Sequence, residues 1–208
     1  MKGKIDMEQQ LHVWNVTETL LESRVIKIYG EIDTKLAHEV TSLLDVLSND
    51  DPNTPIKLEI CSPGGSVLDG LAIVDKIRSI KNPVIAFNTG YCASMATVIS
   101  SVCDYAYGTE NSSFLIHEVS SGCQGKLATQ VDDIEFNKSL NKQILTIIAS
   151  KCGKTYDELY DRFKYRDIWM SAKEALEYGL IDEISKTPKK NSKALAEFKK
   201  TFDAYTKK

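Results

Sequence analysis

The chain lacks several features that would place it in a large functional class. No apolar stretch approaches the ~20 residues needed to span a membrane. No Gly-x-Gly-x-x-Gly follows a strand-like run and no Gly-Lys-Ser/Thr occurs, so we expect no nucleotide-binding loop. The net charge of −3 argues against general nucleic-acid binding. We therefore expect a protein that acts neither within a membrane nor on nucleic acid.

Cysteine is present, but in a pattern that argues against two further kinds of site. The five cysteines form an odd set without any Cys-x-x-Cys spacing, which speaks against a zinc site and against a complete disulfide framework. We expect reduced thiols and no bound metal. Near the N-terminus, Lys2 and Lys4 are followed by acidic and amide side chains rather than by the apolar run of a signal peptide. These observations predict a cytoplasmic protein.

Histidine is scarce, with three in the chain. His12 lies in a polar N-terminal stretch, and His38 lies among apolar residues of an expected helix. His117 directly follows the apolar run Phe-Leu-Ile, which places it at the end of a strand where it can reach a cleft. Ser94, in Gly-Tyr-Cys-Ala-Ser-Met, and Asp167, in Arg-Asp, complete a set typical of a serine peptidase. In such a site the histidine activates the hydroxyl and the carboxylate orients the histidine.

Ser94 has two interpretations on local sequence. It precedes an apolar stretch beginning at Met95, so it stands at the start of a buried helix, where unpaired backbone N–H groups can stabilise an oxyanion. Serines at helix starts are usually simple N-caps, and the local sequence alone favours that interpretation. The pair Gly64-Gly65, between a strand and a helix, favours the first, because it lets backbone N–H groups approach a ligand closely.

Strand-like and helix-like runs alternate along the chain. This alternation predicts a single α/β domain with parallel strands, and 208 residues suffice for a substantial core. The expected strands are Arg24 to Tyr29, Ile56 to Ile60, Val84 to Phe87, Tyr105 to Tyr107 and Phe114 to Ile116, with a break after the second at Cys61 to Gly65. The expected helices are Lys35 to Leu47, Val67 to Ile80, Met95 to Val102 and a long one at Leu127 to Ser150.

Four segments occur in the order and spacing of a known family: SPGGSVLDGLAIVDKI, GYCASMATVIS, FLIHEV and YRDIWMSAKEALEYGLIDEI. They resemble the signature blocks of ClpP, the proteolytic subunit of the Clp protease, in the ClpP/crotonase-like superfamily. The similarity runs from about Leu20 to Ile184. It implies a superhelix of β-β-α units with a protruding handle helix. We divide the chain accordingly into an N-terminal segment (1–19, a possible axial region), a peptidase domain (20–185) and a Lys-rich tail (186–208).

The resemblance also implies roles for individual residues. Ser94 matches the nucleophile, His117 the general base and Asp167 the orienting acid, whereas the backbone N–H groups of Gly65 and Met95 match the oxyanion hole. Substrates of the family bind as an added β-strand. This implicates two stretches of backbone, Gly64, Gly65, Ser66 and Val67 before the helix and Gly122, Cys123 and Gly125 after the histidine.

The family further implies an assembly and its partners. The long helix at Leu127 to Ser150 matches the handle that joins two stacked heptameric rings, so we expect a homo-oligomer. Its chamber would admit unfolded polypeptides or short peptides, fed by a Clp-type AAA+ ATPase. The subunit itself would need no cofactor, since only the partner ATPase would use ATP.

The sequence departs from the family pattern at three places, and several alternative functions stay open. Glu118-Val119 stands where many members of the family carry Gln-Pro, Ala96 replaces a glycine, and the first residues do not match the axial region. The alternatives are an ATPase-independent phage-type ClpP-like peptidase, a non-catalytic ring subunit and a crotonase-like acyl-CoA enzyme. An α/β-hydrolase does not fit, because its serine lies in Gly-x-Ser-x-Gly and its acid precedes the histidine.

Overall fold

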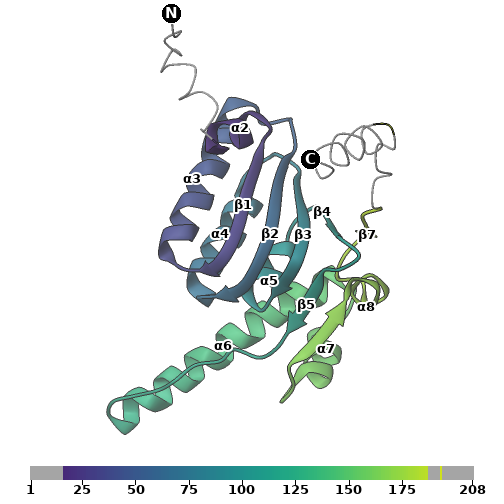
Figure 1. Ribbon diagram of the computed structural model, residues 1–208. Helices are drawn as coiled ribbons and strands as arrows, with labels where there is room; N and C mark the ends of the chain where they lie inside the picture. The colour runs from purple at the N-terminus through teal and green to yellow at the C-terminus, as the bar shows by residue number, and fades with distance from the viewer. Residues whose placement is uncertain (1–15, 187–192, 194–208) are drawn as a thin grey trace, which may run out of the picture.

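A computed structural model describes residues 16–186 and residue 193, and it confirms the alternation of strands and helices (Figure 1). The strands of this part form one seven-stranded sheet. They are β1 (Val25–Ile32), β2 (Ile56–Gly65), β3 (Val84–Ala93), β4 (Tyr105–Gly108), β5 (Ser113–Ile116), β6 (Ile168–Ser171) and β7 (Glu183–Ile184).

The helices include all four that the sequence predicts. They are α2 (Val16–Glu22), α3 (Thr34–Asp50), α4 (Val67–Ser79), α5 (Met95–Ser101), α6 (Leu127–Lys151), α7 (Tyr156–Phe163) and α8 (Ala172–Tyr178). Three of these, α2, α7 and α8, have no counterpart among the predicted elements. They are only seven or eight residues long, although α7 places Tyr156, Leu159, Tyr160 and Phe163 at helical spacing.

The sheet is parallel except at one edge. Its main path runs β1-β2-β3-β4-β7, with every pair parallel. Strand β3 changes partner along its length, because Ile85–Asn88 pair with β4 whereas Tyr91–Ala93 pair with β5. Strand β6 then adds to β5 in the antiparallel direction, which the sequence did not predict. This change of partner opens the carboxyl end of β3, where ligands bind in many open α/β sheets.

Strand β2 continues through the segment where the sequence predicted a break. Pairing of β2 with β3 shifts between Ile60 and Ser62, and the strand then runs on to Gly65, which pairs with Ile32 of β1. Proline is tolerated in strands at such bulges, because it leaves no ladder hydrogen bond unmade. The glycines therefore continue the strand rather than terminate it, and Gly64 lies close to the end of β3.

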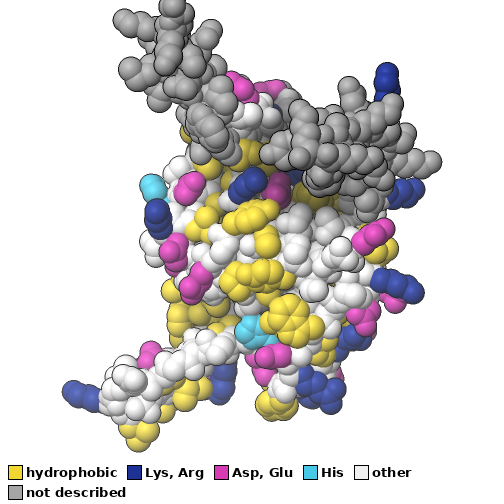
Figure 2. Space-filling model, in the orientation of Figure 1, with side chains coloured by type: hydrophobic (Ala, Val, Ile, Leu, Met, Phe, Trp, Pro, Cys, Tyr) yellow, Lys and Arg dark blue, Asp and Glu magenta, His cyan; other side chains and the backbone are white. Residues whose placement is uncertain are grey.

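One face of the sheet is covered by helices α3, α4 and α5, and over β1, β2 and β3 no helix of residues 16–186 covers the other (Figure 1). In β1, Ile26 and Ile28 are buried whereas Tyr29 is exposed, as expected when one face meets the core. On the open face Phe87 stacks on Tyr107 with ring centroids 4.7 Å apart. Figure 2 shows apolar and charged side chains lying side by side over these strands.

Helix α6 divides into a projecting half and a buried half (Figure 1). The N-terminal half extends beyond the domain and leaves large apolar side chains exposed, namely Leu127, Val131, Ile134 and Phe136. The C-terminal half packs into the core through Leu140, Ile144, Leu145, Ile147, Ile148 and Ala149. The helix predicted at Leu127 to Ser150 is thus confirmed to within one residue at its end.

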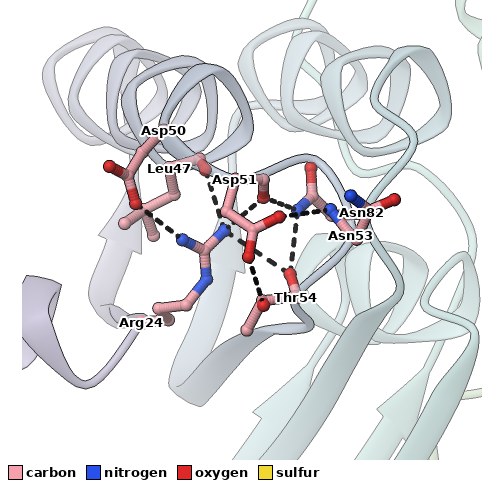
Figure 3. Close-up of polar contacts among 7 residues, drawn as sticks. All are labelled: Arg24, Leu47, Asp50, Asp51, Asn53, Thr54 and Asn82. Atoms are coloured by element: carbon pink, nitrogen blue, oxygen red, sulfur yellow. Dashed lines mark hydrogen bonds and ion pairs between the residues drawn. The ribbon is translucent and has the colours of Figure 1, made fainter.

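Arg24 fastens the end of α3 to the start of β1 (Figure 3). Its guanidinium donates to the backbone oxygens of Leu47 at 2.8 Å and Asp51 at 3.0 Å, and to the Asp50 carboxylate at 3.2 Å. The buried amide of Asn82 donates to the Asp51 oxygen as well, at 2.7 Å. A cation at this position satisfies helix-end carbonyls that have no partner within the helix.

We expect Arg24→Met to lower the free energy of unfolding by about 2 kcal/mol, because hydrogen bonds from a charged donor are lost. Methionine leaves the backbone strain at this residue, where φ is 55°, unchanged. Urea denaturation measures the effect. Lys27→Met is the control, since it breaks a partly exposed ion pair of 3.9 Å and a contact of 5.4 Å with the Tyr29 ring, and should change stability by less than ~1 kcal/mol. Equal losses in the two variants would contradict this role of Arg24.

Most of the predicted N-terminal segment and of the Lys-rich tail lie outside the described residues. The division of the chain into 1–19, 20–185 and 186–208 therefore stays a prediction. Among the helices of the described part, none combines the length and apolar character needed to cross a bilayer.

Candidate active site

Ser94 lies in a strained turn between β3 and α5. Its backbone has φ 55° and ψ −123°, a combination that costs a non-glycine residue about 1–3 kcal/mol. It occupies the N-cap position of α5, yet within the described part of the chain its hydroxyl makes no capping hydrogen bond. The N-cap interpretation is therefore correct for its position and wrong for its side chain. The hydroxyl is free for another role.

The turn is held by hydrogen bonds to β5. The Ser94 N–H donates to the Leu115 oxygen at 3.0 Å, and the buried Thr97 hydroxyl lies within hydrogen-bonding distance of the Leu115 oxygen, at 3.0 Å, and of the Cys92 oxygen, at 2.8 Å. Leu115 precedes His117 by only two residues. These contacts bring the nucleophile candidate and the base candidate to one place.

Ser94 and His117 line the same cavity, of about 210 Å³. Gly65 and Met95, the predicted oxyanion donors, line it too, together with Val67. As the first residue of α5, Met95 has an N–H without a partner inside the helix, so it can donate to a bound group. Four of the five residues that the sequence assigned to the chemistry thus meet at one cavity.

Asp167 does not line this cavity, and its side chain is exposed. The strand register nevertheless relates it to His117. Strands β5 and β6 pair antiparallel up to Ile116 and Ile168, so one further step places His117 opposite Asp167. Residues opposite each other in such a ladder have Cβ atoms about 5 Å apart. Among residues 16–186, no hydrogen bond joins Ser94 to His117 or His117 to Asp167.

Of the predicted substrate-binding residues, Gly65 and Val67 line the cavity. The Ser66 N–H already donates to the Ile32 oxygen at 2.8 Å, so it is not available to a substrate. Gly122, Cys123 and Gly125 lie in the connection from β5 to α6 and do not line the cavity. That side is formed instead by Glu118, Val119 and Ser120, directly after His117.

The remaining wall of the cavity is apolar. It comprises Val98, Ile116, Ile144 and Ile148, with Val67 and Met95 named above. Sequence reasoning placed Ile144 and Ile148 on the apolar face of the long helix but did not link them to the site. Their spacing of four residues was the only available signal.

Cys92, two residues before Ser94, is no rival nucleophile. Its side chain is fully buried, and that burial raises the pKa of the thiol to about 12. Since the thiolate is the reactive form, the thiol is inert near neutral pH. Across residues 16–186, no three His, Cys, Asp or Glu side chains lie together as a set able to hold a metal ion.

Comparisons with known proteins match this architecture. The model of the Clp protease family matches residues 8–188. The chain is 36% identical over 174 residues to the ATP-dependent Clp protease proteolytic subunit 3 of Streptomyces coelicolor, covering 81% of this chain and 78% of that protein. It is 36% identical over 185 residues to the proteolytic subunit of Bacteroides fragilis, covering 85% and 87%. It is 33% identical over 171 residues to proteolytic subunit 2 of Tropheryma whipplei, covering 81% and 94%. The chain therefore belongs to the Clp protease family.

Proposed function

We propose that the protein is a serine endopeptidase of the Clp type, with Ser94 as its nucleophile. The observation that carries this proposal is the strained turn at Ser94, whose uncapped hydroxyl lines a cavity with His117. Strain of this kind is kept where function requires it, since folding alone would favour an ordinary helix start. Membership in the Clp protease family supports the same conclusion.

The mechanism is acyl transfer to serine. His117 takes the proton from the Ser94 hydroxyl as its oxygen attacks a peptide carbonyl, and the N–H groups of Gly65 and Met95 stabilise the oxyanion. His117 then protonates the leaving amine, and water repeats the cycle on the acyl-enzyme. One further step of the pairing between β5 and β6 places Asp167 opposite His117, where its carboxylate can orient the imidazole. The chemistry requires no cofactor of the subunit's own.

The cavity favours an apolar side chain beside the scissile bond. Much of its wall is formed by aliphatic and Met side chains, so a substrate side chain that packs there loses contact with water, while Glu118 lines another side. A volume of about 210 Å³ suits a side chain of moderate size. Unfolded polypeptides and short peptides can present such a side chain, whereas in a folded protein it is usually buried.

A labelling experiment tests the proposed function. The purified protein is incubated with a fluorophosphonate probe, and the modified residue is located by mass spectrometry. Modification of Ser94 alone is expected, because only an activated hydroxyl reacts with the probe. Absence of any labelling would favour the non-catalytic ring subunit, and labelling elsewhere would refute the assignment of Ser94.

The exposed apolar half of α6 supports the proposed homo-oligomer of stacked heptameric rings. Exposed apolar patches of this kind mark interaction sites. The proteins matched above are named as subunits of an ATP-dependent protease. A Clp-type AAA+ ATPase as partner, and a cytoplasmic location, follow for this chain as predictions.

We expect Ile134→Asp to weaken assembly through α6. Ile134 is 45% exposed in the described chain, so the substitution should leave the fold intact while adding a charge to the proposed interface. Native mass spectrometry should show assemblies with half the subunits of the wild type. Glu135→Gln, an exposed change beside it, is the control. An unchanged assembly in Ile134→Asp would show that this part of α6 lies outside the interface.

A further inference from the structure

The pairing that aligns His117 with Asp167 ends one residue before both of them. Strands β5 and β6 are joined up to Ile116 and Ile168, and the next residue on each side lies outside the ladder. Asp167 is exposed, so packing does not fix it either. Some other contact must hold the segment before β6 against the strand end that carries His117.

Glu118 makes such a contact. Its Oε2 atom accepts a hydrogen bond from the Tyr165 N–H at 2.9 Å, across 47 residues of sequence. Glu118 directly follows His117, and Tyr165 precedes Asp167 by two residues. The pair His117 and Asp167 therefore lies between two connections. The β5–β6 ladder joins the segments on one side of the pair, and this hydrogen bond joins them on the other.

The donor of this bond is presented by an unusual turn. Tyr165 has φ 61°, in the left-handed region, and the Arg166 N–H closes the turn on the Phe163 oxygen at 3.1 Å. A non-glycine residue in this region costs about 1 kcal/mol and persists only where its surroundings impose it. A carboxylate accepting the Tyr165 N–H stabilises this conformation.

The segment after His117 is held on its other side as well. The Val119 N–H donates to the Asn141 side-chain oxygen on α6 at 2.9 Å. Glu118 therefore extends from a backbone that is itself anchored. Because its own backbone cannot shift easily, its carboxylate can fix the position of the Tyr165 segment rather than follow it.

We propose that Glu118 is a positioning residue of the hydrolytic site, which holds the Asp167 segment beside His117 through the Tyr165 N–H. The inference rests on the function proposed above. It assigns a role to the position at which this chain departs from the Gln-Pro of many relatives.

Kinetics of Glu118→Ala and Glu118→Gln test the proposal. Glu118→Ala removes the acceptor and should lower kcat, and the rate of fluorophosphonate labelling at Ser94, by about tenfold; the labelling rate is the decisive measure, because Glu118 also lines the cavity that would bind the substrate. Glu118→Gln keeps a carbonyl acceptor for the Tyr165 N–H and should restore most of that rate. Glu177→Ala, which removes an exposed carboxylate from α8, is the matched control. Equal rates in wild type and Glu118→Ala, or a Gln variant as slow as the Ala variant, would overturn the proposal.

A double-mutant cycle with Asp167→Asn separates positioning from general loss of structure. If Glu118 acts through Asp167, then Glu118→Ala should change the labelling rate by less than about twofold once Asp167 is replaced. A full tenfold effect in that background would show that Glu118 acts elsewhere.

Amide hydrogen exchange tests the contact without any activity. Residues 164–168 should exchange about tenfold faster in Glu118→Ala than in wild type, because a hydrogen bond that protects them is lost. Unchanged exchange would refute the contact itself. If the wild type fails to label at Ser94, the proposed function fails, whereas the exchange result still decides whether Glu118 holds this segment.

Discussion

Replacement of Ser94 by alanine should abolish fluorophosphonate labelling and lower peptide hydrolysis by about 10⁴- to 10⁶-fold. The reason is that the hydroxyl oxygen forms the acyl-enzyme, and without it the other groups of the site leave only a residual acceleration of roughly 10³- to 10⁴-fold over water. Hydrolysis of a fluorogenic peptide with an apolar residue before the cleaved bond measures the loss.

The fold should survive this change. Ser94 caps nothing with its side chain, so alanine removes no structural hydrogen bond, and the Ser94→Ala chain should assemble as the wild type does. Cys92→Ser is the control for a thiol nucleophile, and it should still label at position 94. Labelling that persists in Ser94→Ala would eliminate the serine mechanism.

Replacement of Gly64 by alanine should lower kcat/KM by at least about 100-fold, through geometry rather than through loss of a reacting group. An added Cβ would lie 2.7 Å from the Ser94 Cβ, 2.7 Å from the Ala93 oxygen and 2.8 Å from the Met95 nitrogen. These atoms belong to the strained turn itself, so the nucleophile and the proposed oxyanion donor must both move. A displacement of about 1 Å in an active site can cost 100-fold in rate.

Gly153→Ala is the control that distinguishes the effect of a steric clash from the effect of backbone strain. Gly64 and Gly153 both have positive φ, at 92° and 63°, but an added Cβ at Gly153 meets no heavy atom within 4 Å. Gly153→Ala should therefore lower stability by about 1 kcal/mol and leave the rate of hydrolysis near that of wild type. Full activity in Gly64→Ala would show that the end of β2 does not position Ser94.

The sequence predicted the parts of the fold that repeat a strong local pattern. The strand at Ile56 to Ile60 is an example, because its apolar residues alternate with polar ones. It did not predict that β2 continues to Gly65, since proline and glycine usually end a strand. In the structure the ladders to β1 and β3 on both sides keep this segment extended.

The candidate site, too, was predicted from the sequence only in part. Ser94 and His117 were identified from their contexts, and the structure brings them to one cavity. The cavity's lining by Ser120, and the contact of Glu118 with Tyr165, could not be predicted, because they depend on how β5 and β6 bring distant segments together. Such contacts leave no period in the sequence. The role of the connection around Gly122 in binding substrate backbone stays a prediction of the family resemblance.

The strained turn at Ser94 has a consequence for the protein's biosynthesis. Its backbone conformation is held by a hydrogen bond to Leu115 and by contact with Gly64, and the candidate base and acid come still later in the chain. A chain emerging from the ribosome therefore carries an ordinary, unreactive serine until the segment around Asp167 has been synthesised and has folded onto β5. A peptidase that attacks unfolded polypeptides is thus without activity throughout the period in which it is itself unfolded.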